Sequence, residues 1–264
     1  MKRKFGFFDI FRKNDAEIQY QFAMQNLQNG AYEEAVRLLL LSANQGFPLA
    51  QLELADCYAD GYGVAINPIE AFSWYYKAAC SGNPDAQYEV AVCYEQGNGI
   101  DRNLQKAMEW YQKAAEQGIA ESQYNLAQCY ANGLGVKQDA EKAVFWYQKA
   151  AAQGNPYAQF NLGGCYLQGI GVPVNKSVAK KYFEAAKRNG HERADEILKE
   201  YDDYISLFEG KLGIVNYLIE IGKDCMFSDV IEVYAGDGHS IFDMKSHTRL
   251  NECYPHNKKN EIIL

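Results

Sequence analysis

Apolar and polar positions recur with a period of 36 residues between residues 47 and 190. Within each period, small and apolar side chains follow the i, i+4, i+7, i+8 spacing of one helix face, as in Ala50, Leu54, Cys57 and Tyr58. A period of roughly 20 to 50 residues is typical of repeat proteins, whose units bury their apolar faces only against neighbouring units. The pattern therefore predicts tandem copies of one helical unit.

Two helices are predicted in each copy, with a Gly-x-Gly loop between them. In the first copy the loop is Gly61-Tyr-Gly63, and glycine readily adopts the left-handed backbone that ends a helix. A residue suited to cap a helix N-terminus follows the loop in every copy: Asn67, Asn103, Asp139 and Asn175. We therefore expect an all-α fold, an α/α right-handed superhelical solenoid of helix-loop-helix repeats.

The segments on either side of residues 47–190 have different patterns. Residues 1–15 form a basic leader, and residues 16–46 resemble a tetratricopeptide-like first hairpin. Residues 191–209 have the polar outer face expected of a capping helix. Residues 210–264 lose the period and are rich in β-branched and aromatic side chains, which predicts a small C-terminal β-containing appendage.

The repeat motif resembles the Sel-1-like repeats of the tetratricopeptide superfamily. The third copy shows it most fully, in Leu126-Ala127, Tyr130, Gly133-Leu-Gly135-Val136, Lys142-Ala143, Trp146-Tyr147 and the run from Lys149 to Gly154. The resemblance covers four copies in residues 47–190. It implies a non-enzymatic protein-protein interaction scaffold or adaptor that binds a protein or peptide along the solenoid surface and needs no cofactor.

Charge narrows the range of partners. The chain carries 26 Lys and Arg against 34 Asp and Glu, and its acidic body repels phosphate, so nucleic acid is not an expected partner. The leader combines Lys2, Arg3, Lys4, Arg12 and Lys13 with four phenylalanines, so contact with an anionic membrane is one interpretation of it. A disordered leader, or one that lies on the first hairpin, is the interpretation we favour. No secretory signal pattern is present, which predicts a cytoplasmic location.

The predicted partner site lies on the first helix of each copy. At 100° per residue, one row of side chains points away from the buried face: Leu52, Tyr88, Tyr124 and Phe160. Bordering positions carry Glu53, Asp56, Glu89 and Gln128. Aromatic rings in a row suit peptide binding, and acidic borders favour a basic and apolar ligand. The alternative is that these rings pack over the neighbouring repeat.

Cysteines and histidines raise two further hypotheses. Cys57, Cys93, Cys129 and Cys165 recur on the predicted buried face, where we expect reduced thiols that pack as small apolar groups. The appendage gathers Cys225, Cys253, His239, His247 and His256, so an enzyme or metal-binding module in residues 210–264, with zinc as the metal, is the alternative function. A Ser177-x-x-Lys180 pair matches a catalytic motif, but the other copies differ at both positions, so no catalytic residue is predicted.

Overall fold

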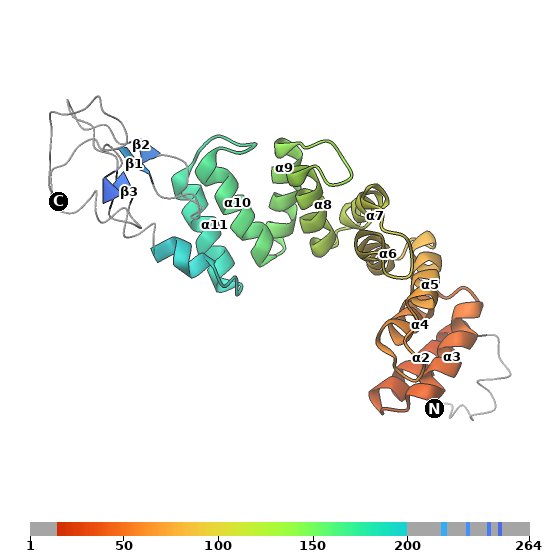
Figure 1. The fold of residues 1–264 in the computed structure, drawn as a ribbon. Coiled ribbons are helices and arrows are strands. Elements are labelled where there is room, and N and C mark those ends of the chain that lie inside the picture. The colour runs from red at the N-terminus through yellow and green to blue at the C-terminus, as the bar shows by residue number, and fades with distance from the viewer. Residues whose placement is uncertain (1–14, 200–217, 221–230, 233–241, 244–247, 250–264) are drawn as a thin grey trace, which may run out of the picture. The chain divides into compact units, whose positions relative to one another are not determined.

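The computed structural model describes residues 15–199 and the short segments 218–220, 231–232, 242–243 and 248–249 (Figure 1). Residues 15–199 contain consecutive helices joined by short loops, and every helix from α2 to α11 has 13 residues. Four packed pairs are α2 (Ala16–Gln28) with α3 (Tyr32–Asn44), α4 (Pro48–Asp60) with α5 (Pro68–Cys80), α6 (Pro84–Gln96) with α7 (Leu104–Glu116), and α10 (Pro156–Gln168) with α11 (Lys176–Arg188). Between the last two pairs, α8 (Ala120–Asn132) and α9 (Ala140–Ala152) follow one another in the chain. The prediction of tandem helix-loop-helix units is confirmed.

The chain divides into two compact units, residues 1–139 and 140–264. In the first unit each helix from α2 to α7 packs against the next along the chain, and in the second unit α10 packs against both α9 and α11. Residues 194–199 are also helical, within the segment predicted to cap the array. The right-handed superhelical path that we expect from the sequence stays a prediction.

Four short strands fall within the predicted appendage: β1 (Leu218–Glu220), β2 (Ile231–Glu232), β3 (Phe242–Asp243) and β4 (Thr248–Arg249). Their order is β2-β1-β3-β4; β1 pairs antiparallel with β2 and parallel with β3, and β3 pairs antiparallel with β4. These fragments do not establish a β-containing domain, because the rest of residues 210–264 lies outside the described residues. Residues 1–14 of the leader also lie outside them.

The predicted helix caps explain where the second helices begin. The side-chain oxygen of Asn67 accepts a hydrogen bond from the Glu70 amide at 3.3 Å, and Asn103 and Asn175 cap α7 and α11 in the same way at 3.0 Å. Each cap satisfies an amide that has no partner within its helix. Helix α4 ends, as predicted, at Gly61, whose φ is 83°.

The second glycine of each loop allows a close contact with the backbone of an earlier helix. Gly63 lies against the backbone at the start of α3, and a methyl group there would overlap the carbonyl of Tyr32 and the amide of Glu33. Three further glycines approach the first turn of the preceding second helix in the same way: Gly99 at α5, Gly135 at α7 and Gly171 at α9. Only glycine allows this contact between backbones, which joins each helix pair to the one before it.

Aromatic and sulfur side chains fill the core between the helices. Trp110 is only 9% exposed, with the Tyr76 ring edge-on at 5.6 Å and the Lys113 ammonium 3.7 Å from the indole centroid. The four periodic cysteines are buried free thiols, as predicted. Burial raises the pKa of Cys165 to about 11, so at neutral pH the sulfur is an uncharged packing group.

Buried tyrosine hydroxyls find different partners in different copies. Tyr75 donates to Asp56 Oδ1 at 2.5 Å, whereas Tyr111, at the equivalent position, donates to Glu95 Oε2 at 2.7 Å. In the second unit the Tyr147 hydroxyl instead accepts from Asn161 Nδ2 at 3.4 Å. A buried hydroxyl without a partner is costly, so each copy has its own polar residue within reach.

A buried glutamine ladder links helix pairs. Gln87 donates to the Ala79 carbonyl at 3.3 Å, and its side-chain oxygen accepts from Gln117 Nε2, 30 residues on, at 2.8 Å. Gln159 repeats the pattern with Asn189 at 2.9 Å. Gln51 Oε1, by contrast, is buried without a partner among the described residues. The residue 30 positions on is Ser81, whose hydroxyl donates to the Lys77 carbonyl of its own helix.

We predict that Ser81→Gln stabilises the fold by about 1 kcal/mol, because the longer side chain brings an amide donor to Gln51 Oε1 as Gln117 does to Gln87. Urea denaturation followed by circular dichroism measures the difference. Ser81→Ala is the matched control and should give no gain, since it supplies no donor. Equal stability of the two variants would contradict this account of the ladder.

We predict that Trp110→Ala destabilises the fold by about 3 to 5 kcal/mol, because removing a large buried ring leaves a cavity. The exposed Glu109 beside it is the control: Glu109→Ala should change the free energy of unfolding by less than about 0.5 kcal/mol. A loss below about 1 kcal/mol for Trp110→Ala would mean that the indole is not part of the core.

Candidate protein-interaction surface

The predicted outward row divides into two groups. Leu52, Tyr88 and Tyr124 are half-buried on α4, α6 and α8, so part of each side chain reaches solvent. Phe160 is only 6% exposed: its ring stacks on the His191 imidazole at a centroid distance of 3.9 Å and meets the edge of Phe183 at 5.6 Å. The prediction that Phe160 points outward is therefore wrong.

The neighbourhood of Phe160 explains the error. Phe160 belongs to an apolar cluster with Phe183 and with Ala194, Ile197 and Leu198 of the terminal helical segment. Because α11 is followed by this segment and not by another 36-residue copy, the position equivalent to Tyr88 and Tyr124 becomes covered. One feature of the sequence indicated this burial: residue 160 is phenylalanine, without the hydroxyl that keeps the tyrosines at positions 88 and 124 partly in water.

Tyr88 combines packing with exposure. Its ring centroid lies 6.0 Å from that of Tyr111, and the Asn125 side chain on α8 lies near enough to its hydroxyl to affect the Tyr88 pKa. This agrees with the alternative that the rings pack over the neighbouring repeat, although the Tyr88 ring is not fully covered. On α8, Gln128 Nε2 donates to the Tyr124 hydroxyl at 2.8 Å, which fixes two predicted site residues relative to each other.

Three predicted carboxylates lie half-buried beside these rings. Burial raises the pKa of Glu53, Asp56 and Glu89 above the usual range. The largest effect is on Glu89, whose pKa rises to about 7, first because of burial and then because Asp56, Asp85 and Asp60 are negatively charged. Glu89 therefore exchanges a proton near neutral pH.

No basic side chain of residues 15–199 forms an ion pair with these three carboxylates: Arg37 pairs with Glu34, and Lys187 and Lys199 pair with Asp195. Within residues 15–199, Asp56 accepts its side-chain hydrogen bond from the neutral Tyr75 hydroxyl. We name the surface formed by Glu53, Asp56, Tyr88, Glu89, Tyr124 and Gln128 the acidic–aromatic face. It presents partly desolvated negative charge next to partly exposed rings, a combination suited to a ligand with cationic and apolar groups.

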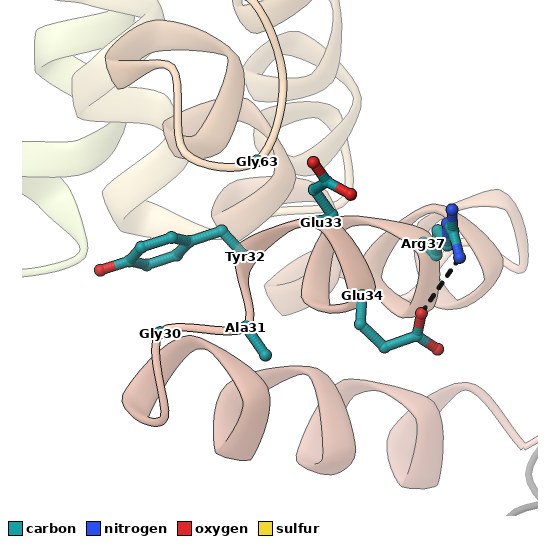
Figure 2. Close-up of a pocket in the computed structure, with 7 residues that line it drawn as sticks. All are labelled: Gly30, Ala31, Tyr32, Glu33, Glu34, Arg37 and Gly63. Carbon is teal, nitrogen blue, oxygen red and sulfur yellow. Dashed lines mark hydrogen bonds and ion pairs between the residues drawn. The ribbon is translucent and has the colours of Figure 1, made fainter.

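A pocket that the sequence reasoning missed lies at the start of α3. It is lined by Gly30, Ala31, Tyr32, Glu33, Glu34, Arg37 and Gly63 (Figure 2). Arg37 Nη1 pairs with Glu34 at 3.3 Å, while the Tyr32 ring points away from that pair, as Figure 2 shows, and lies 5.3 Å from the Tyr62 ring. The pocket is open to solvent and contains none of the predicted site residues. It results from the close approach of the Gly63 loop.

The described part of the chain contains no assembled metal site or membrane-spanning helix, and Ser177 lies at its surface. Among residues 15–199 and the four strands, no three His, Cys, Asp or Glu side chains are arranged to hold a metal ion, and the proposed zinc ligands of residues 210–264 lie outside the described residues. Ser177 is exposed in the first turn of α11. None of the helices between residues 15 and 199 is long and apolar enough to cross a membrane.

The paired 13-residue helices, periodic glycine contacts and buried aromatic core define an α-helical repeat protein. More narrowly, the chain belongs to the Sel1 repeat family, which matches residues 27–47, 48–83, 84–119, 120–155 and 156–191, more than half of its length. The first match begins inside the segment predicted as a tetratricopeptide-like hairpin, so the Sel1 array has a partial copy before the four full ones. Sel1 repeat proteins are generally protein-protein interaction scaffolds.

Two solved structures support the assignment. A Sel1 repeat protein from Oxalobacter formigenes is 40% identical, with a TM-score of 0.61, over 65% of this chain and 49% of that one. The protein c5321, a protective antigen of uropathogenic Escherichia coli with an SLR fold, is 29% identical, with a TM-score of 0.69, over 74% of this chain and 42% of that one. The chain thus spans less than half the length of either. No curated protein gave a significant match.

The raised pKa of Glu89 makes folding stability depend on pH. In the unfolded chain a glutamate loses its proton near its ordinary pKa of 4.5, whereas in the fold Glu89 holds it to about 7. The stabilisation from the protonated form is therefore fully present below pH 4.5 and is lost as the pH rises through 7.

We predict that Glu89→Gln raises the free energy of unfolding by about 1 kcal/mol at pH 8 and leaves it nearly unchanged at pH 4, after allowance for partial solvent screening. Denaturant titrations at the two pH values measure this. Glu109→Gln, an exposed glutamate on α7, is the control and should show no such difference. A Glu89→Gln effect of the same size at both pH values would exclude Glu89 as the titrating group.

Proposed function

We propose that this chain is a non-enzymatic scaffold or adaptor that binds a protein or peptide segment through the acidic–aromatic face. The family assignment supports an interaction role in general. The observation that carries the specific proposal is the placement of half-buried Asp56 and Glu89 beside partly exposed tyrosines without an ion-pair partner among the described residues. Leaving carboxylates partly desolvated lowers stability, and a cationic ligand would offset that cost.

The expected ligand carries lysine or arginine together with aromatic or aliphatic side chains. A cation next to Glu89 favours the ionised carboxylate, so binding should release a proton below pH 7, strengthen as the pH rises towards 7 and level off above it. Long-range attraction mainly accelerates association, while burial of apolar groups against Tyr88 and Tyr124 mainly slows dissociation.

The cytoplasm is the proposed location, because the buried free thiols of the array suit a reducing compartment. An enzyme or zinc-binding module in residues 210–264 is the alternative function, and the clustering of three histidines with Cys225 and Cys253 favours it. Zinc bound stoichiometrically to the purified full-length chain would support that alternative.

A displayed library of random peptides tests the proposed interaction and requires no identified partner. Peptides selected on the full-length chain should be enriched in basic and aromatic residues. The double variant Tyr88→Ala/Tyr124→Ala should weaken their binding by about 2 kcal/mol or more, because truncated rings at a hot spot lose burial. Fluorescence anisotropy of the selected peptides gives the dissociation constants.

Matched variants separate lost contacts from lost folding. Because Tyr88 also packs on Tyr111, thermal melts must show that the double variant is folded. Glu53→Lys/Glu89→Lys should abolish binding, whereas Glu109→Lys/Glu116→Lys, two exposed glutamates of α7, should have little effect. Selected peptides that bind every folded variant as tightly as the wild type would place the partner site elsewhere.

A further inference from the structure

We propose that the basic aromatic leader, residues 1–14, occupies the acidic–aromatic face of its own chain and competes there with external ligands. This inference rests on the proposed function, since it takes the face to be a binding surface. It goes further by naming one occupant. The leader would act as a tethered ligand that an external partner must displace.

The chemistry of the leader complements the face. Five basic residues, Lys2, Arg3, Lys4, Arg12 and Lys13, flank a stretch that contains Phe5, Phe7, Phe8, Ile10 and Phe11 together with the acidic Asp9. The face offers half-buried carboxylates at Glu53, Asp56 and Glu89, with partly exposed rings beside them. No ion pair to those carboxylates comes from residues 15–199. The leader therefore supplies within the same chain both the positive charge and the apolar groups that the face lacks.

The attachment point of the leader lies close to the face. The leader ends where α2 begins at Ala16, and Tyr20, little more than one turn into α2, lies 5.3 Å from the Phe47 ring that precedes α4. The charge of Glu53 on α4 is near enough to raise the pKa of Tyr20 further, after burial. Tyr20, Phe47 and Glu53 thus share one neighbourhood at the near end of the face.

The leader is also long enough. The Tyr20 ring on α2 meets the Phe47 ring before α4, and Asp56 on α4 lies near enough to Glu89 on α6 to raise its pKa. At about 8 to 10 Å for each step, the distance from α2 past α4 to Glu89 is on the order of 20 Å. A 14-residue segment spans at most about 46 Å when extended. A short tether gives an effective concentration in the millimolar range, so even a weak interaction keeps the face occupied.

Binding of a labelled leader peptide tests the proposal. The probe is a fluorescein-labelled synthetic peptide of residues 1–14, added to the full-length wild type and to a full-length variant whose five basic leader residues are replaced: Lys2→Ser, Arg3→Ser, Lys4→Ser, Arg12→Ser and Lys13→Ser. The uncharged leader should leave the face free. The peptide should therefore bind this variant at least about tenfold more tightly than the wild type, measured by anisotropy at low salt.

Two controls place the binding on the face. In the uncharged-leader variant, adding Glu53→Gln/Glu89→Gln should remove peptide binding, whereas adding Glu109→Gln/Glu116→Gln should not. The Gln substitutions keep the side-chain shapes, and the library-selected peptides serve as an independent readout of the face.

Several results would overturn the proposal. Equal affinity of the peptide for wild type and uncharged-leader variant would show that the leader does not compete. Binding that persists after Glu53→Gln/Glu89→Gln would place the leader elsewhere. A leader peptide that binds neither the wild type nor the uncharged-leader variant, but binds vesicles containing phosphatidylserine, would indicate that the leader contacts membranes. A wild-type dimer in sedimentation, lost in the uncharged-leader variant, would assign the leader to a second copy.

Failure of this inference differs from failure of the proposed function. If library-selected peptides bind the face of the uncharged-leader variant while the leader peptide does not, the function stands and the leader is not its occupant. If neither probe binds the face, both proposals fall together.

Discussion

The contact between the second glycine of each loop and the backbone of the preceding helix pair is the constraint on which the array depends. At Gly63, Gly99, Gly135 and Gly171 a loop lies so close to the first turn of an earlier helix that no side chain fits. Because this contact joins backbone to backbone, it fixes how far apart neighbouring pairs lie, whatever their surface residues are. The bonds of Gln87 to Ala79 and of Asn161 to Tyr147, which cross from one pair to the next, then form at distances that this contact has set.

Because the glycine contacts fix the spacing, the side chains at solvent-facing positions can differ from copy to copy. The residues of the acidic–aromatic face differ in this way. At the position of Asp56 the other copies carry Val92, Gln128 and Gly164, and at the position of Glu89 they carry Glu53, Asn125 and Asn161. A neutral side chain at position 89 would avoid the cost of holding a carboxylate whose pKa is raised to about 7. Retaining charge where it lowers stability is common at binding surfaces, where residues are suited to a partner more than to the fold.

The sequence predicted the features that recur in every copy. It did not predict the features that depend on where a copy lies in the array. The caps at Asn67 and Asn103, the buried cysteines and the glycine loops follow from local backbone needs that recur in every copy. Phe160 was misplaced because periodicity alone does not show that the terminal segment covers it. The unpaired Gln51 oxygen and the proton affinity of Glu89 depend on three-dimensional neighbours that are far apart in the sequence.

The varied partners of the buried tyrosines mean that the copies are not interchangeable modules. Tyr75 depends on Asp56, Tyr111 on Glu95, and Tyr147 on Asn161, and each partner occupies a different position of the 36-residue unit. Tyr75 and Asp56 lie in one copy, as do Tyr111 and Glu95, so deleting either whole copy would remove the tyrosine and its partner together. Tyr147 bonds instead to Asn161 of the following copy. Replacing that following copy by one with another residue at the position of Asn161 would preserve every glycine contact but remove this hydrogen bond from the core.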